Sequence, residues 1–257
     1  MDLLELISGN RVHYAMNTIG GVERDISPEK IRDIEKGLNH LEERTKYYRK
    51  IFSTDPTILK RTVEVGILKP KDARELCAVG PTLRASGIKW DVRKDDPYAA
   101  YDEIPFNVIT HEGCDVQSRI LVRCDEILES INIIRYALDK LPLGSFRVRV
   151  PRRVPECEVV GRVEAPRGEL IHYLKANGTE KPERYKIRSP TLGNIPSLCK
   201  MLLGGYVADI PVVVAGIDPC FACMDRMVFI DKERRERWGW TGEQLRRYGI
   251  KWYGEKH

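Results

Sequence analysis

The stretch that most constrains the fold of this chain is Asp218-Pro219-Cys220-Phe221-Ala222-Cys223-Met224-Asp225-Arg226, which sets two thiols three positions apart. A C-x-x-C pair can hold one soft metal ion, form a redox disulfide or lie buried as two small apolar side chains. The spacing alone favours metal ligation and plain burial about equally. The remaining cysteines stand singly: Cys77, Cys114, Cys124, Cys157 and Cys199. Without a second ligand pair, an independent zinc or C-x-x-C redox protein fits poorly.

Further motifs lie upstream of this pair. One is Gly80-Pro81-Thr82-Leu83-Arg84-Ala85-Ser86-Gly87-Ile88-Lys89-Trp90-Asp91-Val92-Arg93-Lys94, where two glycines permit a tight backbone path between basic side chains. Another is Glu164-Ala165-Pro166-Arg167-Gly168-Glu169-Leu170-Ile171-His172-Tyr173. Short glycine-containing stretches, Ser8-Gly9-Asn10-Arg11 and Gly20-Gly21-Val22, lie near the start.

Together these stretches resemble the large-subunit family shared by membrane-bound, energy-converting [NiFe] hydrogenases and the quinone-site large subunit of respiratory complex I. The Asp-Pro-Cys-x-x-Cys-x-x-Arg pattern of 218–226 is similar to the second nickel-ligand motif of the hydrogenases. The stretch 80–94 is similar to the complex I branch, where it implies a docking and architectural element. The stretch 164–173 is similar to both branches, and its arginine is the hydrogenase residue. The resemblance runs nearly from end to end.

The resemblance implies roles for particular residues. Cys220 and Cys223 are expected to be metal ligands of a nickel–iron centre, one of them bridging to iron. Arg167 is expected to set its guanidinium above the metal, as a base or as a hydrogen-bond donor. Asp218 is expected to orient these surroundings, and we group it with Arg167 as catalytic. Glu164 and His172 are weaker candidates.

One element of the family pattern is missing. Hydrogenase large subunits carry a first C-x-x-C far upstream of the second, and none precedes Cys220 here. We therefore expect one part of a split large subunit, or a remnant or fragment, that matches the C-terminal part of the family. A four-thiolate site then needs a partner chain that carries the other two cysteines. The alternative is a non-catalytic scaffold whose cysteines are relics.

Composition narrows the classes of protein. The chain has 257 residues, 42% of them hydrophobic and 32% charged, with a net charge of +5 that is spread out rather than gathered in a basic stripe. This distribution argues against nucleic acid as a partner. No apolar run reaches the roughly 18 residues of a spanning helix, and no signal-peptide pattern opens the chain. The cysteine usage favours a reducing compartment. No G-x-G-x-x-G follows a predicted strand, which assigns any NAD(H) chemistry to another subunit.

These observations, read with the resemblance, predict an assembly. The chain is expected to lie on the cytoplasmic side of the cell membrane, held peripherally by membrane subunits. An adjacent iron–sulfur small subunit is expected to pass electrons from ferredoxin or NADH to protons, a quinone or a sulfur species. Hydrogenase maturation often removes a C-terminal peptide, here at the bond from Arg226 to Met227. The aromatic tail beyond that bond favours its retention.

The predicted fold is a mainly helical α+β fold with a long-helix bundle core and a small β-rich insertion, as in the [NiFe] hydrogenase large subunits. We expect one domain over 1–257, with a helical core over about 1–142, a β-rich part over about 145–188, and the C-terminal motif and tail over 189–257. Ser27 followed by Pro28 predicts a helix start, and helices are expected near 28–52 and 113–141. A heptad-like seam on the second helix predicts packing against other helices: Ile120, Cys124, Ile127, Ile131, Ile134, Leu138 and Leu141.

Shorter elements follow from local patterns. Alternating or β-prone runs predict strands over 145–150, 159–164, 170–175 and 184–187. A short helix is expected over 195–203, then a buried apolar segment over 210–217 that leads to Asp218. The capping-box pattern that begins at Thr241 predicts a last helix.

Overall fold

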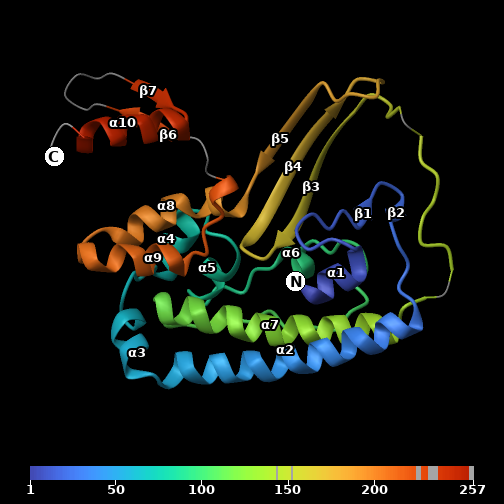
Figure 1. Ribbon diagram of the computed structural model, residues 1–257, viewed down its shortest axis with the longest axis horizontal. Coiled ribbons are helices and arrows are strands. Elements are labelled where there is room, and N and C mark those ends of the chain that lie inside the picture. The colour runs from blue at the N-terminus through green and yellow to red at the C-terminus, as the bar shows by residue number, and fades with distance from the viewer. Residues whose placement is uncertain (143, 152, 224–226, 231–236, 255–257) are drawn as a thin grey trace.

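Two long helices form the base of the molecule. The computed structural model describes residues 1–257 except 143, 152, 224–226, 231–236 and 255–257. In it, α2 (Pro28–Thr54) and α7 (Val116–Asp139) lie side by side and antiparallel (Figure 1). Each begins at a capped N-terminus, because Ser27 accepts a hydrogen bond from the Lys30 amide and Asp115 accepts one from Ser118. Both predicted long helices are confirmed.

The contact between the two helices is apolar at one end and charged at the other. Ile131 is buried against Ile34 and Leu38. Towards the other end, Arg49 holds the Asp125 carboxylate through both its Nε and Nη2 atoms. A partly buried charge pair of this kind fixes the register of two helices that apolar contacts alone would let slide.

The predicted seam on α7 is wrong in part. Ile120, Cys124, Ile131 and Leu138 are buried or half-buried. Ile127, Ile134 and Leu141 are instead 41%, 40% and 40% exposed, and Leu141 lies beyond the last residue of α7. The reason is geometric, since α2 covers one side of α7 and the seam is wider than that contact. The uncovered side borders two cavities, one lined by Ile127 and one by Ile134 together with Leu141.

Short helices and loops join the base to a second core. Their bounds are α1 (Asp2–Ser8), α3 (Pro56–Thr62), α4 (Pro70–Glu75), α5 (Gly80–Arg84), α6 (Val92–Asp95), α8 (Pro190–Leu202), the 3-10 turn η1 (Val207–Asp209), α9 (Ile210–Gly216), η2 (Phe221–Cys223) and α10 (Gly242–Gly254). This second core packs α8 and α9 onto the start of α7 through Met201, Val213, Ile217 and Val116. The helix predicted over 195–203 is α8, and it begins earlier, at Pro190, because Ser189 caps it there.

The segment predicted as buried and apolar over 210–217 is the helix α9. Val213 and Ile217 are buried in it, whereas Ile210 is exposed. The capping box before α10 is confirmed, because the amides of Thr241 and Gln244 each donate to the other's side chain.

A three-stranded antiparallel sheet rises from this base (Figure 1). Its strands are β3 (Cys157–Ala165), β4 (Gly168–Ala176) and β5 (Arg184–Arg188), in the order of the chain. The other strands form two-stranded hairpins: β1 (Asn17–Thr18) with β2 (Gly21–Val22), and β6 (Met227–Ile230) with β7 (Arg237–Trp240). The predicted α+β, mainly helical fold is confirmed.

The strand predicted over 145–150 does not form. Arg147 makes an isolated bridge to Gly21, flanked by hydrogen bonds from Val22 to Phe146 and from Val148 to Gly20. Alternation of apolar and polar residues needs a neighbouring strand of similar length to become a ladder, and β2 is only two residues long. That residues 1–257 make one domain stays a prediction. Among the helices that the structure describes, none has the length and apolar character needed to cross a bilayer.

Candidate functional site

The turn between β3 and β4 presents Arg167. Ala165 pairs with Gly168, so Pro166 and Arg167 form a two-residue hairpin loop. Gly168 has φ +128, a conformation that side chains with a Cβ rarely adopt. A two-residue loop leaves little freedom to its residues, and the Arg167 side chain is therefore displayed at a fixed place on the end of the hairpin.

A glycine contact fixes this turn to the rest of the molecule. Gly80, at the start of α5, has φ +65, and a Cβ built there would lie 2.4 Å from the Cα of Gly168 and 2.5 Å from the Arg167 carbonyl oxygen. No side chain larger than a hydrogen atom fits at Gly80 or at Gly168. The motifs at 80–94 and 164–173 therefore interlock backbone to backbone, which sequence spacing could not reveal.

The end of α9 presents Asp218. Its backbone has φ +53, and its amide donates to the Ala215 carbonyl at 2.9 Å, which closes the helix in a left-handed cap. Asp is among the few non-glycine residues that accept this conformation. Arg167 then grips Asp218 at two points, with Nε 2.6 Å from the carbonyl oxygen and Nη2 3.2 Å from carboxylate Oδ1. The arginine thus fixes both the backbone and the side chain of Asp218.

The two thiols follow Asp218 directly. The Cys220 amide donates to the hydroxyl of buried Thr191 at 3.2 Å, and the Cys223 amide donates to the Cys220 carbonyl at 3.0 Å. The two side chains meet, and the hydrogen bond between them lowers the pKa of Cys220 and raises the pKa of Cys223. The positive charge of Arg167 is a smaller effect that favours the thiolate form of each cysteine, although the pKa of Cys223 stays raised overall. The first thiolate of the pair is therefore favoured at Cys220.

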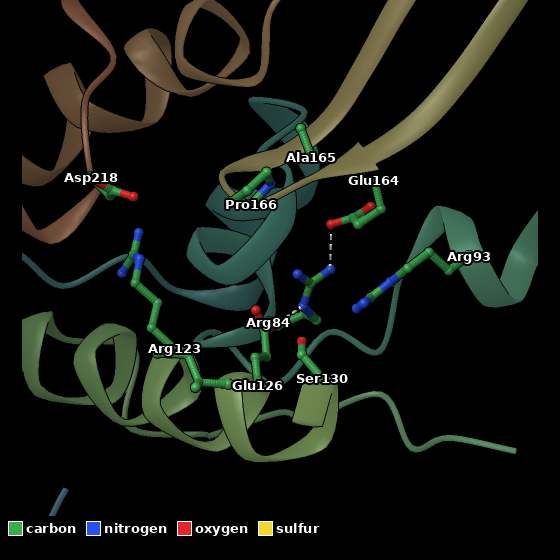
Figure 2. A pocket seen from close by; sticks show the side chains of 10 residues that line it. Arg84, Arg93, Arg123, Glu126, Ser130, Glu164, Ala165, Pro166 and Asp218 are labelled. Atoms are coloured by element: carbon green, nitrogen blue, oxygen red, sulfur yellow. Dashed lines mark hydrogen bonds and ion pairs between the residues drawn. The ribbon is translucent and has the colours of Figure 1, made fainter. Parts of the chain in front are cut away.

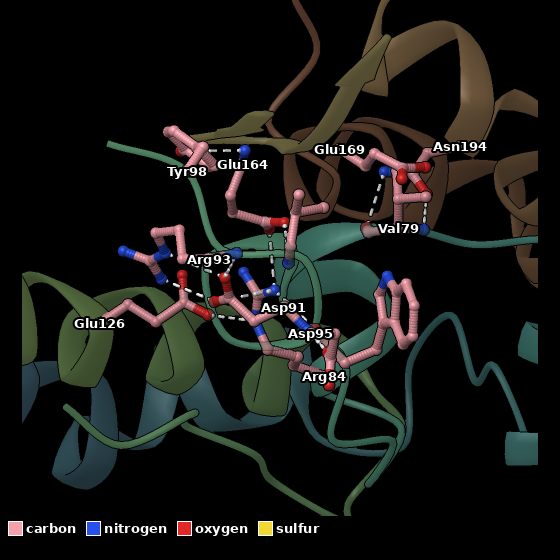
Figure 3. Close-up of polar contacts among 12 residues, drawn as sticks. Val79, Arg84, Asp91, Arg93, Asp95, Tyr98, Glu126, Glu164, Glu169 and Asn194 are labelled. Atoms are coloured by element: carbon pink, nitrogen blue, oxygen red, sulfur yellow. Dashed lines mark hydrogen bonds and ion pairs between the residues drawn. The ribbon is translucent and has the colours of Figure 1, made fainter. Parts of the chain in front are cut away.

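A buried arginine network supports the other side of the hairpin (Figure 3). Arg84 is 1% exposed, and its guanidinium contacts Glu126 at 2.6 Å, Glu164 at 2.8 Å and Asp91 at 3.5 Å. Burial raises the pKa of Glu164. Burial opposes the charge on Arg84 too, but Glu126 and Glu164 raise its pKa overall. Every charge in this network has a partner, as a buried ion-pair cluster requires.

Another tie joins α8 to the same region. Asn194, which is fully buried, accepts a hydrogen bond from the Val79 amide at 2.9 Å and donates to its carbonyl at 3.2 Å (Figure 3). Thr191, whose hydroxyl binds the Cys220 amide, also lies on α8. The Asn194 contact therefore fixes the helix that positions Cys220 against the start of α5.

A cavity of about 310 Å³ lies between these groups. It is bordered by α7, the β3–β4 turn and the loop that carries Asp218 (Figure 2). Its charged lining consists of three arginines, Arg84, Arg93 and Arg123, and three carboxylates, Glu126, Glu164 and Asp218. The other lining residues are Ile127, Ser130, Ala165 and Pro166. Figure 2 shows the guanidinium of Arg123 directed from α7 towards Asp218.

The structure brings Arg167, Asp218, Cys220 and Cys223 together. It does not bring His172 to them, since His172 contacts Tyr185 on the sheet and lies five strand residues, about 16 Å, beyond Arg167. Glu164 is held in the Arg84 network. Arg226, which closes the motif, lies outside the described residues.

Sequence reasoning missed two supporting residues. Thr191 contacts the backbone of Cys220, and Ser189 contacts the side chain of Cys223. The only local signal was the capping pattern Ser189-Pro190-Thr191, which predicts a helix start and says nothing of a cysteine close to thirty residues away.

The two thiols fit half of a soft-metal site. Their side chains are adjacent, and a fixed cation stands beside them. Across the part of the chain that the structure describes, no group of three or more His, Cys, Asp or Glu side chains is arranged to hold a metal ion. The geometry therefore fits a thiolate pair that shares a metal with ligands from elsewhere.

Comparison with known proteins shows the family of the chain. Residues 1–226 match the sequence profile of the family described as the respiratory-chain NADH dehydrogenase, 49 Kd subunit. The chain belongs to this family. The relatives of this 49 Kd subunit family member include a membrane-bound hydrogenase subunit as well as NADH-quinone oxidoreductase subunits.

Three relatives and one structure are informative. The chain is 41% identical to the carbon monoxide-induced hydrogenase of Rhodospirillum rubrum over 227 residues, which cover 88% of this chain and 63% of the relative. It is 34% identical to formate hydrogenlyase subunit 5 of Escherichia coli over 250 residues, covering 97% and 44%. It is 37% identical to the membrane-bound hydrogenase subunit alpha of Pyrococcus furiosus over 251 residues, covering 91% and 59%.

A solved structure of the membrane-bound sulfane sulfur reductase, an archaeal respiratory membrane complex, contains a chain with the same fold. The TM-score is 0.81 at 32% identity, covering 88% of this chain and 63% of that one. The chain thus spans between 44% and 63% of the length of these relatives.

Proposed function

We propose that this chain is a component of the large subunit of a membrane-bound, ion-translocating oxidoreductase. Electrons from ferredoxin or NADH pass through an adjacent iron–sulfur subunit to protons, a quinone or a sulfur species. The observation that carries the proposal is the convergence of Arg167, Asp218, Cys220 and Cys223 at one place on the surface. The names of the family members, which include hydrogenases and NADH-quinone oxidoreductase subunits, support the same class of reaction.

In this proposal Cys220 and Cys223 hold nickel, and a partner chain with the first C-x-x-C supplies the other two thiolates. When bound, a nickel–iron centre supplies redox chemistry at a soft metal that can bind hydrogen. This chain contributes the surroundings. Arg167 keeps a permanent positive charge and hydrogen-bond donors beside the thiols, because a guanidinium does not lose its proton at physiological pH. Asp218 holds that guanidinium in place.

The assembly follows from the same reading. Membrane subunits anchor the chain peripherally at the cytoplasmic side, and an iron–sulfur small subunit and the chain with the first C-x-x-C cover its apolar faces. Support comes from the apolar cavity beside α7 that Ile134 and Leu141 line, and from relatives that belong by name to membrane-bound complexes. Nucleic acid is not a partner in this proposal.

A second candidate function is a non-catalytic scaffold half-subunit in which the cysteines are relics of metal ligands. One observation favours it. Among the described residues the thiol pair is accompanied by no third candidate ligand. The two candidates make opposite statements about nickel, and a metal measurement therefore separates them.

The proposed role of Arg167 is tested by Arg167→Lys in the complex co-expressed with the two partner subunits. We expect hydrogen-dependent reduction of methyl viologen to fall about 10²-fold, because lysine keeps the charge but loses the fixed pair of donors. The matched control is Arg162→Lys, since Arg162 lies on β3 and pairs with Asp96 at 2.6 Å. Nickel content is measured in parallel and should stay unchanged. Activity within about twofold of wild type would contradict the proposed role, and no activity in any sample would favour the scaffold.

A further inference from the structure

Arg123 has an unused hydrogen-bonding edge. Its Nη1 atom donates to the Arg119 carbonyl at 2.9 Å. Its Nε and Nη2 atoms are buried and have no hydrogen-bond partner among the described residues. Buried N–H groups without a hydrogen-bond partner are costly, because the desolvation of those groups is not compensated. Burial lowers the pKa of Arg123 accordingly.

The unused atoms are the two that bind planar anions side on. In Arg49, Nε and Nη2 grip the Asp125 carboxylate. In Arg93, the same two atoms grip Asp91 at 2.9 and 2.7 Å. This fork matches the spacing of two carboxylate oxygens. The chain thus uses the same edge elsewhere for carboxylates and leaves it empty at Arg123.

The surrounding carboxylates are already engaged. Glu126 and Glu164 are bound to Arg84, and Asp218 is bound to Arg167. None of them makes an ion pair with Arg123 in the described structure. The side chain of Arg123 lines the cavity of about 310 Å³, so space for a further group lies beside it.

We propose that this cavity is a binding site for a carboxylate, which pairs with the Nε and Nη2 edge of Arg123. A planar monoanion suits the site better than phosphate or sulfate. Among the described residues that line the cavity, Arg123 offers a single unpaired edge, while the cavity wall already carries three carboxylates that would repel a dianion. The carboxylate comes either from a small free acid or from a Glu or Asp side chain of another chain inserted at the cavity mouth. The inference does not depend on nickel at the cysteines.

The test uses the purified chain and two probes, acetate and the capped peptide acetyl-Gly-Glu-Gly-amide, followed by ligand-observed NMR. We expect at least one probe to bind with a dissociation constant of about 1 mM, as a single charge-assisted pair gives. Binding should weaken at least about tenfold in Arg123→Met and to an intermediate extent in Arg123→Lys, which keeps the charge without the fork. Acetate binding without the peptide identifies a small free acid, and peptide binding without acetate identifies a protein side chain.

The matched control is Arg135→Met, the same change on α7 at a residue that pairs with Glu42 outside the cavity. It should leave probe binding unchanged. Without probe, Arg123→Met should melt about 2–4 °C higher than wild type, because it removes two buried N–H groups that have no hydrogen-bond partner among the described residues. Two results would overturn the proposal. One is probe binding that is equal in wild type and Arg123→Met, or absent from both. The other is a large drop in melting temperature of Arg123→Met, which would show that Arg123 already has its partner within the chain.

Discussion

Replacing Gly80 by alanine should destabilise the protein by about 2–4 kcal/mol and displace Arg167. The new Cβ would lie 2.4 Å from the Cα of Gly168 and 2.5 Å from the Arg167 carbonyl oxygen, so two backbones must separate. Overpacking costs about 1–3 kcal/mol, and a Cβ at φ +65 adds about 1 kcal/mol. Urea denaturation measures the loss.

Gly87→Ala is the control for the backbone conformation. Gly87 has φ +73, and its nearest neighbour to a new Cβ is the Glu112 side chain at 3.4 Å. The control therefore carries the same left-handed strain without the collision, and it should lose only about 1 kcal/mol. Equal losses in the two variants would show that the close approach of α5 to the β3–β4 turn is not what fixes Arg167.

Replacing Arg84 by methionine should destabilise the protein by about 3–5 kcal/mol, because Glu126 and Glu164 lose their buried counter-charge, whereas Asp91 keeps its ion pair with Arg93 at 2.7 Å. The loss should depend on pH. Burial already raises the pKa of Glu164 above its ordinary value, and removal of Arg84 leaves the Val92 amide to oppose the effect of burial. A carboxyl whose pKa is higher in the folded state contributes stability below its unfolded pKa and loses it as pH rises through the folded pKa.

The variant should therefore be less destabilised at about pH 4 than at about pH 8, and denaturant midpoints at the two values measure this difference. Arg84→Met combined with Glu126→Gln and Glu164→Gln should recover part of the loss, since it removes the two carboxylates that lose their ion pair with Arg84. A single variant as stable as wild type at both pH values would mean that the network is not a structural support.

Local sequence signals predicted both long helices and the three-stranded sheet. Ser27 and Pro28 set the start of α2, and the hairpin of β3 and β4 followed from β-prone runs. Non-local partners decided the rest. Ile127 and Ile134 share the spacing of Ile131, but only Ile131 faces α2. The 145–150 run alternates correctly and lacks a long enough neighbour.

The candidate site divides in the same way. The place of Arg167 beside Asp218 followed from the resemblance to a family, since more than fifty residues separate them in the chain. The contact of Gly80 with Gly168 and the empty edge of Arg123 carry no local pattern. The close approach of two backbone segments and the lack of a hydrogen-bond partner both depend on how the whole chain packs. They can be seen only in the folded structure.

Nickel content tests most directly whether Cys220 and Cys223 are half of a metal centre. It is measured in the complex purified with the chain that carries the first C-x-x-C, and in the same complex containing Cys220→Ser and Cys223→Ser. Thiolates are the ligands that soft metals need, and hydroxyls do not replace them. We expect stoichiometric nickel in the wild-type complex, little nickel in the variant, and little in the wild-type chain purified alone. Nickel absent from the wild-type complex, or equal in the complex and its variant, would contradict the assignment of Cys220 and Cys223 as half of a metal centre.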